Sequence, residues 1–406
     1  MKILLIHNEY GRLSGEEVVV QGLRNLLDAH GHEVRSYFRS SAELTSMTFG
    51  AALAFFSGIY NPWAIRDIQA MIAEERPDIV HIHNLYPIIS PAVLPVIRQA
   101  GVPIVMTVHN YRLICPNGLF MRNGIICEKC IGGREFYCII HNCENQLLKS
   151  AGYALRNWVA RKNAYFMENI SIFACLTGFQ KVKLMAGGFP GNKIRVIPNT
   201  VDITTESVAA SCPPGEYVGF IGRISPEKGV HLLMDSSRKL SDIPFRAAGA
   251  VDRMPEMTAM AASNFIFDGH LNKIALNEFI RNSRFIVLPT LCYEGFPTVI
   301  VEAMIMGKPV ICSCIGGLPE IVEDNVTGCL VEPGNKRDLA EKIRWLWQHP
   351  DICEKMGQAG REKAIRHYSS ERHYASLLKM YQDAICIQEK SILQSNRKQG
   401  FNAPKK

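Results

Sequence analysis

Two glutamates and the residues between them form the segment EGFPTVIVE, whose residue types and spacing suit the binding of a phosphorylated sugar. The segment follows an apolar run at 285–288, so Glu294 is expected on the loop at the carboxyl end of a strand. Pro297 suits the first turn of the next helix, and Glu302 then lies about one and a half turns into it. The free N–H groups and dipole of a helix start favour phosphate, and a carboxylate can accept ribose hydroxyl groups. The segment therefore predicts a nucleotide or sugar-phosphate site.

Two cations stand in the segment VGFIGRISPEKGV, where a predicted strand passes into a helix. The guanidinium fork of Arg223 suits a diphosphate, and Lys228 adds a point charge. The alternative is that both are solvated surface charges, the usual position of Arg and Lys. Their place directly after a strand favours binding of a diphosphate.

Loops after strands of the first half carry further polar groups. Gly15 precedes a helix, where the backbone can approach a phosphate or sugar closely. His109 ends a predicted strand, and we expect it to face the ligand rather than to pack at the strand end. His81 and His83 share one face of another strand. A metal-binding pair is one interpretation, and we favour one buried histidine and one that lines the cleft.

Short apolar runs alternate with helical patterns, which predicts α/β architecture with parallel sheets covered on both faces. A chain of 406 residues suits two domains, and such domains bind ligands in a cleft at the carboxyl ends of their strands. The expected strands are 2–7, 33–38, 79–83, 103–108, 170–176 and 194–197 in the first half, and 217–221, 245–248, 265–267, 285–288, 310–312 and 329–331 in the second.

The expected domains are residues 1–200, with a cysteine-rich insert at 112–145, and residues 216–365, joined by a turn-rich linker at 201–215. A C-terminal helix is expected at 366–385, and one possible path takes this helix back to the first domain. The polar, basic residues 386–406 are expected to form a disordered tail.

The whole segment 294–334 resembles the E-x7-E region of glycosyltransferase family 4, a retaining family with the GT-B fold of two Rossmann-like, doubly wound parallel-sheet domains facing a central cleft. Arg223 and Lys228 fit the family pattern G-R-x-x-x-x-K-G. The resemblance covers roughly residues 1–385. Its further matching context is Gly307-Lys308-Pro309-Val310, Gly316-Gly317, Pro319-Glu320-Ile321-Val322, Thr327-Gly328 and Pro333-Gly334.

The resemblance implies a role for each matching residue. His109, Glu294, Arg223 and Lys228 are implied as catalytic residues, with His109 at the transferred sugar. Ser14-Gly15 replaces the paired glycines of many relatives, so only a backbone contact of Gly15 is inferred. The implied nucleotide-sugar contacts are Gly15, Arg223, Lys228, Gly269, His270, Leu271, Glu294, Gly295, Phe296, Pro297, Thr298 and Glu302.

The implied reaction moves a sugar, hexosyltransferase-like, from a nucleotide-diphosphate sugar to a saccharide acceptor with retained stereochemistry. The cations and the helix start would stabilise the departing diphosphate, so we expect neither a cofactor nor a catalytic metal. One alternative is a nucleotide-sugar-binding protein without turnover, which the intact charged residues argue against. Another is a nucleotide-dependent oxidoreductase, which the absence of G-x-G-x-x-G from both first loops argues against.

Five cysteines fall between residues 115 and 143 and include the pair Cys127-Glu-Lys-Cys130. Four thiolates with such a pair fit a closed structural zinc site. Reduced, buried thiols are the alternative, and the sequence leaves both open. The candidate ligands are Cys115, Cys127, Cys130 and Cys143.

The mild formal charge of +7 suits an anionic ligand or a phospholipid surface, and it falls short of the dense basic clusters of a nucleic-acid binder. Neither a signal peptide nor a spanning segment is recognisable. The segment 146–162 is amphipathic and basic, and either packs on a core or lies on an anionic membrane. The chain resembles bacterial surface-polysaccharide transferases, so we expect a cytoplasmic protein. A further hypothesis is that its acceptor is lipid-linked and that the protein contacts the inner face of the membrane peripherally.

Overall fold

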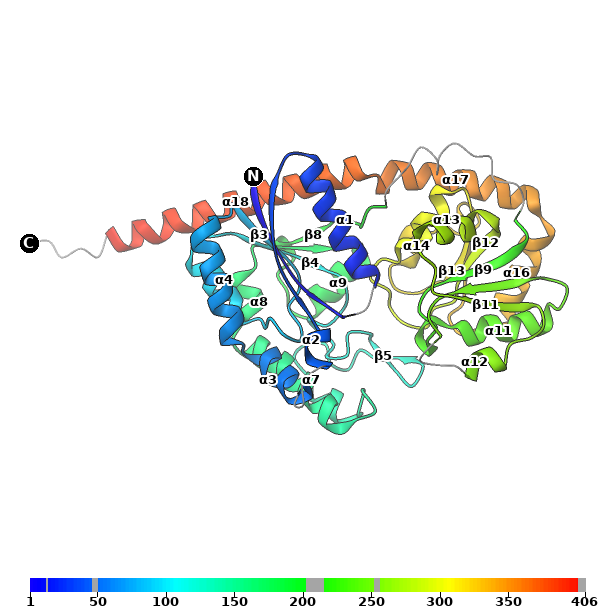
Figure 1. Cartoon of the computed structure of the whole chain (residues 1–406), viewed down its shortest axis with the longest axis horizontal. Coiled ribbons are helices and arrows are strands. Elements are labelled where there is room, and N and C mark those ends of the chain that lie inside the picture. The colour runs from blue at the N-terminus through cyan, green and yellow to red at the C-terminus, as the bar shows by residue number, and fades with distance from the viewer. Residues whose placement is uncertain (12–13, 46–49, 202–214, 252–255, 401–406) are drawn as a thin grey trace, which may run out of the picture. The chain divides into compact units, whose positions relative to one another are not determined.

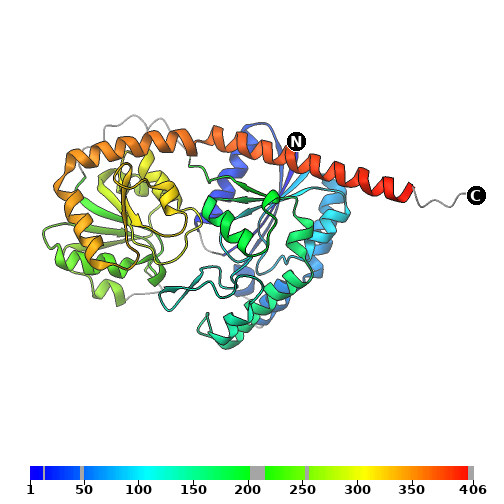
Figure 2. The ribbon, with the colours of Figure 1, turned by 180° about the vertical axis from the view of Figure 1, so that it is seen from behind.

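The computed structural model covers the whole chain and describes residues 1–11, 14–45, 50–201, 215–251 and 256–400 (Figures 1 and 2). Most of the linker expected at 201–215 lies outside these residues. Contacts divide the chain into two compact units. Unit 1 comprises Met1–Gly118, Lys129–Pro198 and His373–Lys406, and unit 2 comprises Leu119–Glu128 and Asn199–Arg372.

Unit 1 contains a parallel sheet of six strands in the order β2-β1-β3-β4-β7-β8. Near-continuous apolar runs such as Ile3-Leu4-Leu5-Ile6 are fully buried in it, as expected for strands covered on both faces. The strands are β1 (Lys2–Glu9), β2 (Glu33–Ser40), β3 (Ile79–Asn84), β4 (Ile104–Val108), β7 (Ile172–Cys175) and β8 (Ile194–Val196). The helices that precede the second unit are α1 (Gly15–Ala29), α2 (Ala42–Thr45), α3 (Gly50–Ile59), α4 (Pro62–Glu75), α5 (Val93–Gln99), α6 (Phe136–Ile140), α7 (Leu147–Lys162), α8 (Tyr165–Asn169), α9 (Gly178–Ala186) and the 3-10 turn η1 (Gly191–Lys193).

Unit 2 repeats the architecture with a second parallel sheet, in the order β11-β10-β9-β12-β13-β14. Its strands are β9 (Tyr217–Ile221), β10 (Phe245–Ala248), β11 (Phe265–Gly269), β12 (Ser283–Leu288), β13 (Val310–Ser313) and β14 (Gly328–Val331). A short hairpin, β5 (Met121–Arg122) and β6 (Ile125–Ile126), also belongs to this unit. The helices are η2 (Pro226–Lys228), α11 (Val230–Lys239), α12 (Glu256–Ala259), α13 (Lys273–Asn282), α14 (Thr298–Ile305), α15 (Leu318–Ile321), α16 (Lys336–Gln348) and α17 (Pro350–Tyr368).

The last helix, α18 (Ser370–Gly400), lies along unit 1 in both views of the ribbon (Figures 1 and 2). Leu377, Met380, Tyr381 and Ala384 are almost completely buried in one cluster with core residues of β1 such as Ile3. The hydrophobic core of unit 1 is therefore completed by the C-terminal end of the chain.

The twelve predicted parallel strands are confirmed, with ends that differ by at most two residues. The disordered tail predicted from residue 386 is wrong as far as Gly400, because α18 continues to that residue. Residues 386–400 contain no proline and are rich in helix formers, so a helix already fixed by its buried turns can propagate through them. Residues 401–406 lie outside the described part of the chain.

Candidate active site

The sheet of unit 2 has a topological switch point between the neighbouring strands β9 and β12. The chain leaves β9 towards β10 and leaves β12 towards β13, on the opposite side. Loops that diverge in this way open a crevice at the carboxyl ends of the strands, where α/β proteins bind ligands. The two loops here carry Arg223 and Lys228 after β9, and Glu294 after β12.

Lys228 and Glu294 form an ion pair at this switch point. The Nζ atom of Lys228 donates to both carboxylate oxygens of Glu294, at 2.8 Å each. The hydroxyl group of Thr290 also donates to Oε1 of Glu294, at 2.8 Å. The two charged side chains are only 18% and 11% exposed, so their attraction is screened less than that of a surface pair.

Arg223 lies in the same loop but is 54% exposed. Its Nη2 atom is 3.1 Å from Oε1 of Glu227, and a pair this exposed adds little stability. The backbone carbonyl of Glu227 accepts a hydrogen bond from the N–H of Leu291 at 2.8 Å, and the hydroxyl oxygen of Thr290 lies 3.0 Å from the same carbonyl oxygen. The two loops are thus joined to each other, while the guanidinium group faces solvent.

Replacing Gly229 with alanine should lower the free energy of unfolding by about 2–5 kcal/mol. Gly229 has φ 73°, in the left-handed region, and an added Cβ would collide with the backbone carbonyl of Pro289. The collision would force apart the loops that hold Lys228 and Glu294. Urea unfolding measures the effect, with Gly22→Ala as the control because a Cβ there meets nothing within 4 Å. Equal midpoints for wild type and Gly229→Ala would contradict the prediction.

Glu302 lies in α14 and has a cationic neighbour that the sequence did not indicate. The Nζ atom of Lys273, from α13, is 3.0 Å from Oε1 of Glu302. Glu302 is 13% exposed and Lys273 58%. The pair joins residues 29 positions apart, so no local pattern reveals it.

The remaining predicted contacts of unit 2 lie at the ends of two strands. Pro297 precedes Thr298, the first residue of α14. Phe296 is buried and packs edge-on against Tyr368, with ring centroids 5.3 Å apart. These contacts fix the direction in which the helix starts. The other predicted residues, Gly269, His270, Leu271 and Gly295, are exposed or half-buried.

The β5–β6 hairpin, although it comes from the first half of the sequence, packs against the loop that carries Glu294. Phe120 is completely buried, with its ring 5.9 Å from that of Tyr293. The hydroxyl of Tyr293 donates to Oε1 of Glu128 at 2.7 Å. Tyr293 immediately precedes Glu294, so the hairpin steadies the backbone of the site.

Unit 1 has its own switch point, between β1 and β3; of the two predicted site residues of this unit, Gly15 comes after β1, and His109 comes after β4, the neighbour of β3. Gly15 is the first residue of α1, and a Cβ there would meet nothing within 4 Å. His109 directly follows β4, and its Nε2 atom is 2.8 Å from Nδ1 of His83. Burial lowers the pKa of His109 to about 3, so the ring is uncharged at neutral pH.

A buried carboxyl group beside the first strand was missed by the sequence analysis. The hydroxyl of Tyr10 donates to Oε2 of Glu16 at 3.0 Å, and Nη1 of Arg112 donates to the Tyr10 hydroxyl at 3.1 Å. Burial raises the pKa of Glu16 to about 7, against the opposing charge of Arg112. A carboxyl group that titrates near neutral pH can exchange protons with a bound hydroxyl group. The only local signal was an acidic residue at a helix start after a strand.

His81 and His83 are both buried, so the expectation that one of them lines a cleft is wrong. His81 is hydrogen-bonded to the hydroxyls of Tyr381 and Thr107, both at 2.8 Å, and its ring lies against that of His83 in a tilted arrangement, with centroids 4.3 Å apart. Strand alternation placed the two rings on one face, and the covering helix α18 removed that face from solvent.

Unit 1 should lose stability as the pH falls below about 6.5, because four buried histidines resist protonation. Burial lowers the pKa of His7 to about 4 and of His81 and His109 to about 3, and the pKa of His83 falls well below its usual value. As the pH falls below about 6.5, the unfolded chain binds protons on these histidines and the folded chain does not. The free energy of unfolding therefore falls by up to about 1.4 kcal/mol per pH unit for each histidine. Urea midpoints between pH 7.5 and 5 test this, and His7→Asn should flatten the slope whereas exposed His270→Gln should not. A midpoint independent of pH would contradict it.

The predicted zinc ligands do not form one site. Among the residues that the structure describes, no group of three or more His, Cys, Asp or Glu side chains is placed to hold a metal ion. Cys115, Cys130 and Cys143 belong to unit 1, whereas Cys127 belongs to unit 2, where its N–H donates to the carbonyl of Phe120 at 2.8 Å. Because the β5–β6 hairpin packs in unit 2, the two cysteines of the C-x2-C pair are assigned to different units.

Two parallel-sheet units, each with polar loops at its switch point, define the GT-B class of glycosyltransferase folds. The family model described as "Glycosyltransferase Family 4" matches residues 13–205, and the family model described as "Glycosyl transferases group 1" matches residues 215–349. The chain belongs to this family of glycosyltransferases, which confirms the family and fold predicted from the E-x7-E segment.

Individual relatives are distant. A glycosyltransferase of Methanocaldococcus jannaschii is 32% identical over 173 residues, which cover 40% of this chain and 47% of the relative. A 42.6 kDa protein in the cps region of Klebsiella pneumoniae is 25% identical over 79% of this chain and 87% of its own length. Anabaena HepE, solved in complex with UDP, is similar with a TM-score of 0.65 and 17% identity, covering 94% of this chain and 100% of that one. The chain thus spans about half the length of the first relative, and the structural similarity establishes the fold.

Proposed function

We propose that the protein is a retaining glycosyltransferase, which moves a sugar from a nucleoside-diphosphate sugar to a saccharide acceptor in polysaccharide biosynthesis. The observation that carries the proposal is the Lys228–Glu294 pair at the switch point of unit 2, in a chain of this family. The K. pneumoniae relative from a cps region supports a role in polysaccharide synthesis.

The donor diphosphate is proposed to bind between the two cations. Lys228 is held in place by Glu294, and the exposed fork of Arg223 can close on the phosphate oxygens. Glu302 is proposed to accept the ribose hydroxyls, and the first N–H groups of α14 to bind phosphate oxygens. The base is proposed to lie at the β11 turn, with Gly269, His270 and Leu271, and the sugar beside Gly295, Phe296, Pro297 and Thr298.

The reaction breaks the bond between the anomeric carbon and the diphosphate oxygen. Negative charge gathers on the departing nucleoside diphosphate, and Arg223 and Lys228 stabilise it electrostatically. The acceptor oxygen then bonds the anomeric carbon on the face that the diphosphate left, and its proton passes to the leaving phosphate oxygen. This internal-return route needs no covalent enzyme intermediate.

Unit 1 is proposed to supply the acceptor side, with the uncharged ring of His109 against the transferred sugar and the backbone of Gly15 close to the donor. We propose a lipid-linked saccharide as the acceptor and the cytoplasmic side of the membrane as the place of reaction. The complex of Anabaena HepE with UDP makes uridine diphosphate sugars the first donors to test.

The experiment is hydrolysis of UDP-, GDP- and ADP-sugars by the full-length protein, with release of the nucleoside diphosphate as the readout. One donor should be hydrolysed slowly, and Arg223→Ala should reduce that rate by about 10²-fold. Arg337→Ala is the matched control, because Arg337 is 86% exposed and pairs with a surface glutamate, Glu341, on its own helix. The proposal fails if none of the UDP-, GDP- and ADP-sugars is hydrolysed and none of UDP, GDP and ADP raises the melting temperature. A thermal shift without turnover would favour a nucleotide-sugar-binding protein.

A further inference from the structure

Helix α7 buries small and polar side chains and exposes large apolar ones, which is the reverse of an ordinary amphipathic helix. Its buried residues are small or polar: Ser150, Gly152, Ala154, Arg156, Asn157 and Ala160. The large apolar side chains of the same helix are exposed, with Leu148 at 89% and Trp158 at 46%, together with Leu147 and Leu155. Helices in globular proteins normally bury such side chains.

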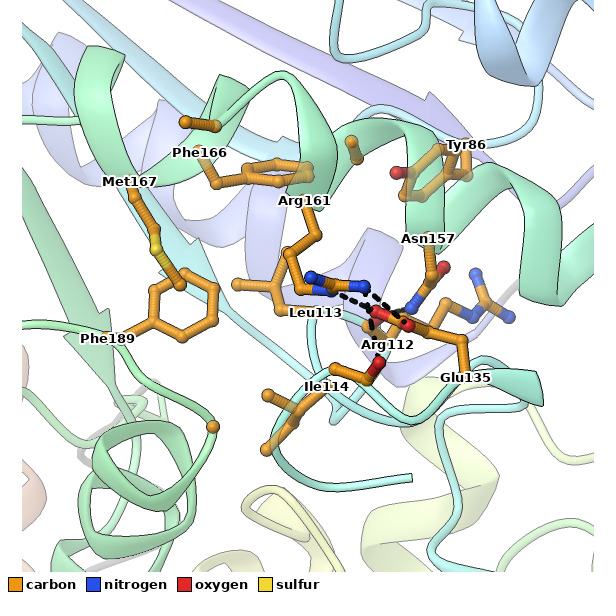
Figure 3. Close-up of a pocket in the computed structure, with 14 residues that line it drawn as sticks. Tyr86, Arg112, Leu113, Ile114, Glu135, Asn157, Arg161, Phe166, Met167 and Phe189 are labelled. Atoms are coloured by element: carbon orange, nitrogen blue, oxygen red, sulfur yellow. Dashed lines mark hydrogen bonds and ion pairs between the residues drawn. The ribbon is translucent and has the colours of Figure 1, made fainter. Parts of the chain in front are cut away.

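Specific inward contacts hold α7 in this orientation. Gly152 leaves no room for a side chain against the ring of Phe55 in α3. The Nδ2 atom of Asn157 donates to the carbonyl of Arg112 at 2.6 Å, and Nε of Arg161 donates to Oε1 of Glu135 at 2.7 Å. Figure 3 shows these polar groups at a cavity of about 460 Å³, a volume that includes space open to solvent. Rotating the helix to bury its leucines would break all of these contacts.

The neighbouring helix α6 extends the exposed apolar surface. Cys138 of α6 packs on Ala154 of α7, while Phe136 and Ile140 are 50% and 65% exposed. We call the six exposed side chains together the α6–α7 face: Phe136, Ile140, Leu147, Leu148, Leu155 and Trp158. Helix α3 lies beside α7 in both ribbon views (Figures 1 and 2), and its side chain Phe56 is 65% exposed.

The exposed charged side chains of the segment that carries the α6–α7 face are positive, and two of them, Lys149 and Arg161, pair with the less exposed Glu144 and Glu135. Between residues 129 and 163 the chain has six Lys or Arg side chains and two Glu. Five of the bases are exposed: Lys129, Arg134, Lys149, Arg161 and Lys162. In that segment, all of which is described, neither glutamate is exposed. Lys162 follows Leu148 and Leu155 at seven-residue intervals, so it lies on the same line along the helix.

We infer that the α6–α7 face is a docking surface for an anionic lipid bilayer. Apolar side chains on one side of a basic helix enter the boundary between headgroups and acyl chains, while the cations contact anionic headgroups. The helix lies in the interface, and no helix among the described residues is long and apolar enough to cross a membrane. The inference rests on the surface alone. It deepens the proposed function because a lipid-linked acceptor would be presented at the same boundary.

The test is sedimentation of the full-length protein with phosphatidylcholine vesicles, with and without phosphatidylglycerol. We expect binding only to the anionic vesicles and its weakening by salt. Leu148→Gln with Trp158→Gln should reduce binding about tenfold. Val182→Gln with Met185→Gln, which changes two exposed apolar residues of α9 in the same unit, should leave binding unchanged.

Three readouts decide between outcomes. Trp158→Phe should lose most of the tryptophan quenching by lipids brominated on their acyl chains, whereas loss of quenching by Trp345→Phe instead would place the contact elsewhere. No binding to anionic vesicles, or equal binding by the Leu148/Trp158 variant, would overturn the inference. A dimer that this variant dissociates, without vesicle binding, would assign the face to a second copy of the chain. Because nucleotide-sugar hydrolysis is measured in solution, failure of docking and failure of the proposed reaction are distinguished.

Discussion

Replacing Lys228 with alanine should reduce kcat/KM for sugar transfer by about 10²–10³-fold. The Lys228 side chain is 18% exposed, and its ammonium group is positioned by Glu294 and, through that carboxylate, by Thr290. In the proposed mechanism, a preorganised cation at the switch point stabilises the departing diphosphate without having to move when charge develops. In its absence the charge must be stabilised by Arg223 and by solvent, so kcat should fall as well as kcat/KM.

The kinetics should be measured with the donor that the hydrolysis panel identifies. Lys336→Ala is the matched control, because Lys336 also pairs with a carboxylate of unit 2, Asp235, but is 53% exposed. That control should change kcat/KM less than twofold, as expected for a surface ion pair. The melting temperature of both variants must be compared, because Lys228→Ala leaves Glu294 partly buried without its cation. A well-folded Lys228→Ala variant with wild-type kcat/KM would show that the reaction centre lies elsewhere.

Replacing Tyr381 with alanine should lower the stability of unit 1 by about 4–6 kcal/mol. The side chain is completely buried in the cluster that contains Ile3 and Leu5, and its hydroxyl is 2.8 Å from Nδ1 of His81. The substitution opens a cavity and also removes a hydrogen-bond partner from a buried imidazole. Tyr381→Phe retains the ring and should cost about 1–3 kcal/mol, the contribution of the lost partner.

Urea unfolding of the full chain measures both variants, with the transition of each unit followed separately because two-domain proteins need not unfold in one step. Ile387→Ala is the matched control, since Ile387 lies on the same helix but is 42% exposed. It should change stability by less than about 0.5 kcal/mol. If Tyr381→Ala and Ile387→Ala behaved alike, the helix would not contribute to the core of unit 1.

The sequence predicted the strands and helices that flank Arg223, Lys228, Glu294 and Glu302 well because their signals are local. Glu294 and Glu302 are separated by one loop and part of one helix, and Arg223 and Lys228 by a single strand-to-helix turn. Each apolar run of a buried parallel strand is continuous, so the positions of the strands could be inferred without knowledge of their partners. The residues that flank the strand ends follow from those positions.

Pairings between distant parts of the chain were beyond such reasoning. Lys228 and Glu294 are 66 positions apart, and His81 and Tyr381 are 300 apart. The cysteine spacing left a zinc site and reduced thiols both open, and it did not show that the hairpin between Cys115 and Cys130 packs in unit 2 together with Cys127. Spacing within a motif records which residues are near in the chain, and it contains no information on which unit will bury them.

Helix α7 shows the same division most clearly. Its sequence shows an amphipathic, basic helix, and by itself determines that one face is apolar. Which face points inward depends on Phe55 against Gly152 and on Glu135 against Arg161, and these partners come from other elements. The sequence alone therefore determined the α/β class, the strands and the positions of the loops that carry the predicted site residues, through local periodicity and turn chemistry. Tertiary structure alone decided which charges pair, which histidines are buried and which apolar surface remains exposed, because those outcomes depend on contacts between residues far apart in the chain.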